Sequence, residues 1–219
     1  MDTRFLPAPR ERYQAAYDKA SRDMAALDPV AAAERAGVDY VETGAGEGEF
    51  RLPFFGRKYA IAFPSLAASE VGVEKRPSLV TQVLLLHYLI TADGAPLAGE
   101  WVAFRYLPSG RVYEAAFEGR GPRELGRVFG QDREAFVRAA RALDGHELRF
   151  GDASYSFRPL PRLALACVLW LGDEELPGSA KVLFDAAAGH YLPTEDLAAV
   201  GGMLAGHLLR LGDQGLRLA

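Results

Sequence analysis

Acidic residues are concentrated between residues 170 and 196, and they are the side chains in this sequence best suited to chemistry. The segment holds six carboxylates and one histidine, with Lys181 as its only formal cation. Carboxylate oxygens are the ligands that hard divalent cations prefer, and an imidazole nitrogen can complete such a site. A metal-dependent enzyme is therefore one hypothesis for this chain. Its candidate metal ligands are Asp173, Glu174, Asp185 and His190.

The same acids have a second interpretation, as solvated loop residues. If residues 163–171 and 180–185 pair as a hairpin, Asp173 lies at its turn and Asp185 at its far end, about 17 Å away. A single cation needs its oxygens within about 2.6 Å, so carboxylates this far apart could not share it. The sequence leaves both interpretations open.

His87 is the second candidate for chemistry, because it lies within the strongly apolar segment 77–91. A buried imidazole must find a hydrogen-bond partner or change its pKa. We therefore expect either a hydrogen-bonded core histidine or a ligand to a cofactor that lies against this helix.

Other short motifs are incomplete. The glycine-rich segment 44–48 lacks the following helix of a phosphate loop, and a hairpin turn is expected there. His146 and Glu147 begin a zinc-protease motif, but Phe150 stands where its second histidine belongs. Cys167 lies in the middle of an apolar run and is expected to be a core residue.

Composition limits the functional classes further. The net charge of −4 is unlike the basic face of a general nucleic-acid binder, so we expect no nucleic-acid partner. The apolar stretches are shorter than the roughly 20 residues that cross a bilayer, and no secretory signal is recognised, so we expect a cytoplasmic protein without a membrane partner. A single cysteine can form neither an intrachain disulfide nor an iron–sulfur site by itself.

Hydrophobic periodicity predicts the elements that would position these groups. Amphipathic helices are expected at residues 10–27, 122–129, 133–143 and from 194 onward, with a short helix after Asp28. Strands are expected at residues 38–42, 49–52, 58–63 and 180–185. Hairpins are expected from residues 101–107 with 111–117 and from residues 147–150 with 154–157.

Two segments are apolar enough to form the interior. Residues 77–91 are apolar nearly all round and predict a buried helix, and residues 163–171 predict a central strand covered on both faces. Because hairpins dominate, we predict an α+β fold with a mixed or mostly antiparallel sheet, one buried central helix and flanking helices. We expect one domain that spans residues 1–219.

The order of several short segments resembles an uncharacterised prokaryotic family, a domain of unknown function that is common in anaerobes. The resemblance covers about residues 10 to 210. The matching segments are residues 84–89, 96–101, 104–105, 107–110, 160–162, 169–175, 183–185 and 191–197.

The resemblance implies a role without implying a catalytic residue. Some relatives are fused to a small four-cysteine iron–sulfur module of corrinoid methyl-transfer proteins, which this chain lacks. This implies a non-catalytic accessory domain of anaerobic redox or one-carbon metabolism, with a corrinoid as cofactor and an iron–sulfur or corrinoid protein as partner. A protein–protein adaptor is a further hypothesis. The candidate cofactor-binding residues are His87, Trp101, Arg105 and Trp170.

Overall fold

The computed structural model describes residues 9–216, and it divides the chain into two compact units. Of these residues, unit 1 contains 9–95 and His190–Leu192, and unit 2 contains Pro96–Gly189 and 193–216. Helices and antiparallel sheets occur in both, which confirms the predicted α+β class. One domain over residues 1–219 stays a prediction.

The first helices of unit 1 begin and end where capping residues predict. Helix α1 spans Pro9–Ala25 and α2 spans Pro29–Ala36. The Asp28 side chain accepts a hydrogen bond of 2.9 Å from the Ala31 N–H, and Pro29 fills the first helical position. Gly37 ends α2 in the left-handed conformation that glycine adopts most readily.

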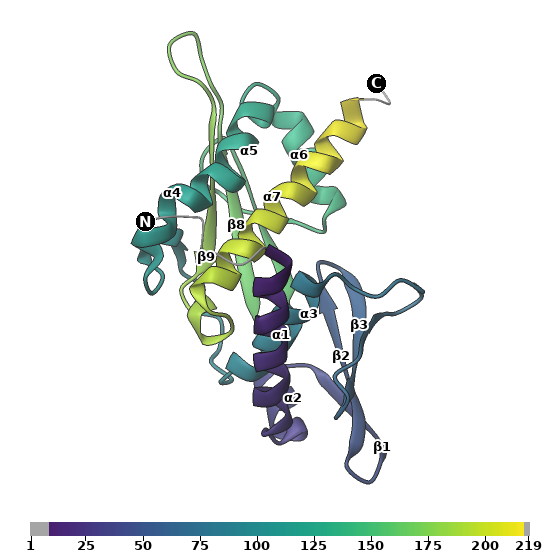
Figure 1. Cartoon of the computed structure of the whole chain (residues 1–219). Coiled ribbons are helices and arrows are strands. Elements are labelled where there is room, and N and C mark those ends of the chain that lie inside the picture. Colours follow the sequence, from purple (N-terminus) through teal and green to yellow (C-terminus); the bar gives the residue numbers. More distant parts are fainter. Residues whose placement is uncertain (1–8, 217–219) are drawn as a thin grey trace. The chain divides into compact units, whose positions relative to one another are not determined.

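Unit 1 also contains a four-stranded antiparallel sheet in the order β1-β2-β3-β4 (Figure 1). Its strands are β1 (Asp39–Gly44), β2 (Glu47–Phe54), β3 (Arg57–Phe63) and β4 (Ala68–Glu70). Alternate residues Phe50, Leu52 and Phe54 of β2 are buried, as the period of a half-buried strand requires. The glycine-rich segment is the turn between β1 and β2, which confirms the predicted hairpin.

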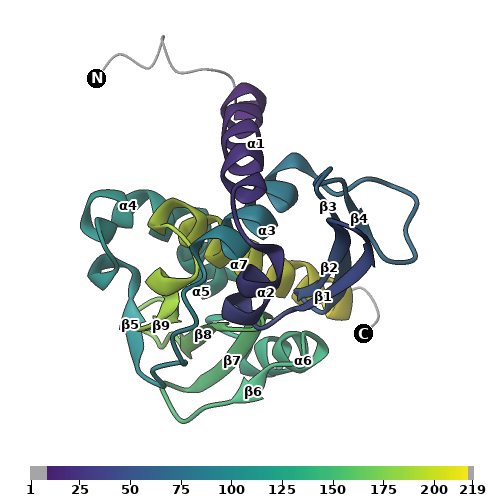
Figure 2. The same ribbon diagram turned by 90° about the horizontal axis from the view of Figure 1, so that it is seen from below.

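Helix α3 (Leu79–Thr91) is the apolar helix of unit 1, and it packs against α1 (Figure 2). Ser78 caps it by accepting a hydrogen bond of 3.1 Å from the Thr81 N–H. The buried Tyr88 hydroxyl donates a hydrogen bond of 2.6 Å to the Ala36 carbonyl, which ties α3 to α2. The predicted packing of this helix against the strand at 163–171 stays a prediction, because that strand belongs to unit 2.

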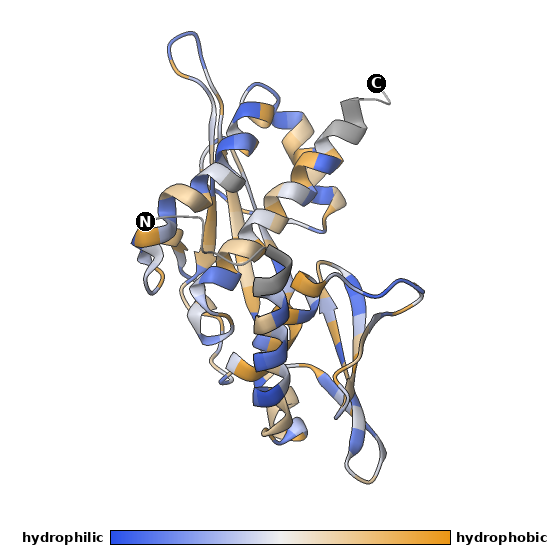
Figure 3. Ribbon diagram, in the orientation of Figure 1, coloured by the Kyte–Doolittle hydropathy of each residue, from blue (hydrophilic) through white to orange (hydrophobic). Residues whose placement is uncertain are grey.

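Unit 2 is built on a five-stranded antiparallel sheet in the order β5-β9-β8-β7-β6. Its strands are β5 (Trp101–Ala103), β6 (His146–Glu147), β7 (Ala153–Leu160), β8 (Leu163–Trp170) and β9 (Ser179–Asp185). The middle strand β8 is buried from its first residue to Leu169, so the predicted central strand is confirmed. Figure 3 shows the apolar character of this strand.

The helices of unit 2 are α4 (Gly110–Arg120), α5 (Pro122–Phe129), α6 (Arg133–Ala142) and α7 (Thr194–Leu216), with short 3₁₀ turns η2 (Phe104–Tyr106) and η3 (Ala188–His190). Helix α5 lies very close to β9, because a β-carbon at Gly126 would stand only 2.8 Å from the Ser179 Cα. Among residues 9–216, no helix has the length and apolarity that crossing a membrane would require.

The predicted hairpin of residues 101–107 with 111–117 is wrong. Strand β5 is short and pairs with β9, and the second predicted strand is helix α4. Phe117 of α4 stacks on Phe104 with ring centres 4.4 Å apart, and it also contacts Phe184 of β9. Burial of this aromatic cluster stabilises the helix over the local strand-like alternation.

Candidate functional site

Asp173, a predicted metal ligand, stabilises the loop between β8 and β9. Its Oδ1 accepts hydrogen bonds from the backbone N–H groups of Leu176 at 2.8 Å and Glu175 at 2.9 Å. These hydrogen bonds, with that from Leu176 the stronger influence, lower the pKa of the Asp173 carboxyl. The carboxylate oxygen is thus already engaged in shaping the loop.

Asp185, a second predicted ligand, is buried and accepts three backbone hydrogen bonds. Oδ1 accepts from the N–H groups of Ala98 and Ala187 at 2.9 Å each, and Oδ2 accepts from Gly99 at 2.8 Å. A buried carboxylate is tolerated only with such partners. Asp185 therefore fastens the segment before β5 to the end of β9.

The strand register separates these two acids. Ser179, at the start of β9, pairs with Trp170, and Asp185, at its end, pairs with Trp101. Six residues of strand separate the two ends, which corresponds to about 20 Å. The predicted separation of the two acids along the hairpin is therefore confirmed.

His190, the remaining predicted ligand besides Glu174, belongs to unit 1 and pairs with a different acid. Its Nδ1 lies 2.6 Å from Asp93 Oδ2, and both side chains are about half exposed. The hydrogen bond with His190, followed by that from the Ala95 N–H, lowers the pKa of Asp93. In the part of the chain that the structure describes, no three His, Cys, Asp or Glu residues gather to hold a metal ion. The metal site stays a prediction.

The predicted cofactor-binding residues are likewise distributed over the fold. His87 lies on α3 in unit 1 and is half-buried, whereas the sequence predicts full burial. In unit 2, Trp101 of the edge strand β5 pairs with the last residue of β9, and Trp170 of β8 pairs with its first residue. The two tryptophans therefore lie about 20 Å apart along the direction of β9. Arg105, on η2, is 3.5 Å from Glu114 Oε1 and stands over the Tyr106 ring. Their shared role as a cofactor site stays a prediction.

Cys167 is fully buried in β8. Burial raises the pKa of its thiol to about 12, because the thiolate would lose its hydration. The predicted core role of this cysteine agrees with its burial.

Four residues with exposed apolar side chains lie at the end of the five-stranded sheet that carries the β8–β9 loop. We call this the sheet-end surface, and it consists of Phe150, Trp170, Leu171 and Leu176. These side chains are 48%, 38%, 39% and 68% exposed, respectively. The β8–β9 loop extends beyond the sheet in Figure 1, and Figure 3 shows a hydrophobic stretch within its otherwise hydrophilic course.

Hydrogen bonds hold the backbone of the sheet-end surface in place. Asp152 Oδ2 accepts from the Leu171 N–H at 2.7 Å, and the Asp152 N–H donates to the Leu169 carbonyl at 2.9 Å. The Gly172 N–H donates to the Gly130 carbonyl at 2.8 Å, which fixes the loop to the end of α5. A β-carbon at Gly151 would stand 3.3 Å from the Trp170 ring, so the β6–β7 turn lies directly against that side chain.

Sequence reasoning identified only part of this surface. The sequence indicates an aromatic group, Trp170, and a polar acidic loop, residues 173–175, at the end of a predicted strand. Leu176 was missed, although a leucine inside the Gly-, Pro- and acid-rich segment 172–178 is itself an indication of an exposed apolar side chain. Phe150 was assigned to a strand, whereas it lies in the turn before β7.

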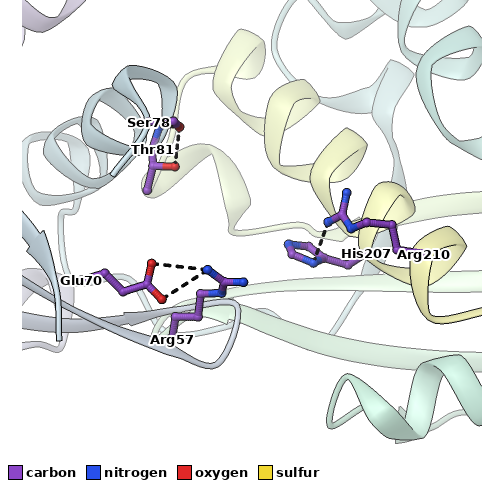
Figure 4. Close-up of polar contacts among 6 residues, drawn as sticks. All are labelled: Arg57, Glu70, Ser78, Thr81, His207 and Arg210. Atoms are coloured by element: carbon purple, nitrogen blue, oxygen red, sulfur yellow. Dashed lines mark hydrogen bonds and ion pairs between the residues drawn. The ribbon is translucent and has the colours of Figure 1, made fainter. Parts of the chain in front are cut away.

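Polar pairs elsewhere join neighbouring strands or lie within one helix (Figure 4). Arg57 Nη1 donates to both oxygens of Glu70, at 3.2 and 3.3 Å, and so joins β3 to β4. Arg210 donates to His207 Nδ1 at 3.0 Å within α7. These contacts stabilise individual elements.

Comparison with known proteins places these features in a family. A family model described as "Domain of unknown function (DUF3786)" matches residues 28–207. The match confirms the resemblance to an uncharacterised domain, while the occurrence in anaerobes and the fusion to an iron–sulfur module stay implications of the resemblance. The comparisons with curated proteins and with solved structures gave no match.

Proposed function

The chain belongs to DUF3786, a domain family of unknown function, and we propose that it is a non-catalytic module that binds a protein partner. The sheet-end surface is the observation that supports this proposal. It presents a tryptophan and three further apolar side chains to solvent at one end of a sheet.

Exposed apolar side chains in a group are typical of interaction sites, whereas single ones are ordinary. Tryptophan is among the residues that contribute most to binding energy at protein interfaces. The loops that carry these side chains are already fixed by hydrogen bonds to Asp152 and Gly130, so little conformational entropy would be lost on binding.

An affinity selection tests the proposal. A random peptide library is selected against the full chain, and each enriched peptide is then titrated against the variant Trp170→Ala/Leu176→Ala. We expect enriched peptides whose affinity falls at least about tenfold in this variant, because truncating interface anchors typically costs more than 1 kcal/mol.

A matched control removes another exposed apolar side chain of unit 2. Val112, on α4, is 79% exposed, so Val112→Ala removes apolar surface outside the sheet-end surface. Peptides should bind this control as they bind the wild-type chain. Peptides that bind the wild-type and Trp170→Ala/Leu176→Ala chains equally would refute the proposal.

We further propose that the natural partner is an iron–sulfur or corrinoid protein of anaerobic redox or one-carbon metabolism. The family resemblance is what supports this identity. A change in the visible absorbance of a corrinoid, or of a corrinoid protein, on addition of the chain would support it, and an unchanged spectrum together with no binding would refute it.

We propose the cytoplasm as the location of this binding. Cys167 is the single cysteine of the sequence, so the chain can form no intrachain disulfide. Its fold therefore needs no oxidising compartment and is compatible with the reducing cytoplasm. Cell fractionation followed by immunodetection tests this location.

A further inference from the structure

Resting on the proposed function of the sheet-end surface, we infer that its occupant is a segment of a partner protein that combines apolar side chains with lysine or arginine. Two properties support this inference. The first is the negative charge of the acids next to the sheet-end surface, and the second is the affinity of the exposed Trp170 indole for cations.

Negative charge predominates beside the apolar side chains. Glu174 and Glu175 are exposed, and within residues 9–216 neither forms an ion pair. The carboxylate charges of this loop are therefore available to a partner.

Cations near the surface are fewer, and one of them is engaged. Arg133 donates from Nε to the Asp152 backbone carbonyl at 2.9 Å, and Asp152 is itself an acid beside the sheet-end surface. Arg149 precedes Phe150 and is exposed. Lys181 interacts electrostatically with Glu118 of α4. Burial raises the pKa of the Glu118 carboxyl, and the positive charge of Lys181 partly opposes this rise. Asp152, Asp173, Glu174 and Glu175 against Arg133, Arg149 and Lys181 leave a net charge of −1 on these residues, which favours a basic partner.

The indole of Trp170 adds a second reason for a cationic partner. A tryptophan face attracts lysine and arginine side chains through its quadrupole, and tryptophan is the strongest such aromatic. Apolar parts of the same segment would cover Leu171 and Leu176, while its cations would lie over Trp170 and near Glu174. A partner of purely apolar or acidic character would leave these carboxylates unpaired.

The chain itself contains exposed residues of the same chemistry, so a second copy is the competing occupant. Val71 and Val73 are exposed beside the exposed Lys75 and Arg76 of unit 1. If the chain bound itself in this way, sedimentation velocity would show association that both Trp170→Ala and Lys75→Glu/Arg76→Glu abolish. That result would overturn the inference of a separate partner.

The same random peptide selection tests this inference when the charge of the enriched peptides is also analysed. Peptides that depend on Trp170 should be enriched in lysine and arginine next to leucine, phenylalanine or tryptophan. Their affinity should fall at least tenfold in the charge-reversal variant Glu174→Lys/Glu175→Lys and should weaken as salt is raised. The exposed acid Glu47 of unit 1 provides the matched control, since Glu47→Lys should leave the affinity unchanged.

The outcomes separate this inference from the proposed function. Trp170-dependent peptides without basic residues, or with an affinity that charge reversal does not change, would overturn the inference and leave the proposed function intact. A selection in which no peptide depends on Trp170 would overturn both.

Discussion

Asp185 is a metal-ligand candidate in the sequence, and in the structure its carboxylate holds two segments of the backbone together. An acid next to a histidine-containing segment is typical of a metal site in sequence. In the structure its two oxygens accept three backbone N–H groups and fasten residues 98 and 99 to β9. Sequence could not predict this, because two of the three partners, Ala98 and Gly99, lie more than 80 positions away.

Replacing Asp185 should therefore destabilise the fold. In Asp185→Asn the amide NH₂ would face a backbone N–H donor, which leaves buried polar groups unsatisfied, and we expect a loss of about 2–4 kcal/mol in the free energy of unfolding. Urea denaturation measures this loss. Glu174→Gln, at an exposed acid, should change it by less than about 0.5 kcal/mol. Equal effects of the two substitutions would contradict the structural role of Asp185.

Cys167 should be unreactive in the folded chain. Its thiol is fully buried with a pKa of about 12, so almost no thiolate exists at neutral pH. A thiol reagent such as DTNB should label the native chain far more slowly than the chain in denaturant. Rapid labelling of the native chain would show that β8 is open to solvent.

Asp173 should contribute to stability in a pH-dependent way. Its folded pKa is lowered by backbone hydrogen bonds, so its contribution is present above the pKa of the unfolded state and is lost as pH falls through the folded value. A carboxyl NMR titration should place the Asp173 midpoint below that of an unfolded aspartate. The shift should shrink in 8 M urea, and a normal midpoint in the folded chain would contradict the loop geometry.

At the scale of elements, the sequence predicted most helices and strands from periodicity and caps. Asp28, Pro29 and Gly37 bound α2 as expected, because each acts through its immediate neighbours. Helix α4 was missed because its stability depends on the contacts of Phe117 with Phe104 and Phe184, which are distant in sequence. Helix α7 begins at Thr194, and the Thr194 hydroxyl donates a hydrogen bond of 2.6 Å to the Pro108 carbonyl, a contact distant in sequence.

The glycines of α7 show the same limit of local reasoning. Three glycines of α7, Gly201, Gly202 and Gly206, could each allow a neighbouring element to pack closely. Only Gly201 among these three is in tight contact, since its β-carbon would stand 2.7 Å from the Phe117 ring. A β-carbon at Gly202 would meet nothing within 4 Å, and at Gly206 only the Arg210 guanidinium at 3.5 Å. Which side of a helix faces a neighbour depends on the tertiary fold.

A pair of alanine substitutions tests this packing. Gly201→Ala should destabilise the chain by about 1–3 kcal/mol, because the new methyl group would overlap Phe117 and Phe184. Gly202→Ala should instead stabilise it by up to about 1 kcal/mol through helix propensity. Thermal or urea unfolding of the two variants measures the difference, and effects of the same sign would contradict the predicted packing of α7.

At the scale of the whole molecule, the structure shows an α+β fold and the family match shows a domain family of unknown function. The α+β class was predictable, because hairpins and apolar segments are local patterns. The division into two compact units was not, since residues 190–192 join unit 1 from far along the chain. Tyr191 is buried there, contacts the Tyr88 ring and donates a hydrogen bond to the Ala95 carbonyl.

The same long-range folding explains why the candidate sites could be predicted only in part. Residue type correctly indicated Trp170 and the acidic loop as features of a strand end. Periodicity could not show that Trp101 and Trp170 lie at opposite ends of the β9 ladder, or that His190 pairs with Asp93. The exposed surface became recognisable only when the turn containing Phe150 was placed beside the end of β8.

The most direct test of the account compares one selected peptide on two chains by isothermal titration calorimetry. Leu176 is 68% exposed, whereas Trp170 is 38% exposed and lies against the β6–β7 turn, so thermal unfolding first establishes that the wild-type chain and Trp170→Ala/Leu176→Ala are both folded at the titration temperature. We predict that the peptide binds the variant at least about tenfold more weakly than the wild-type chain. Equal affinities on two equally folded chains would show that the sheet-end surface is not the binding site.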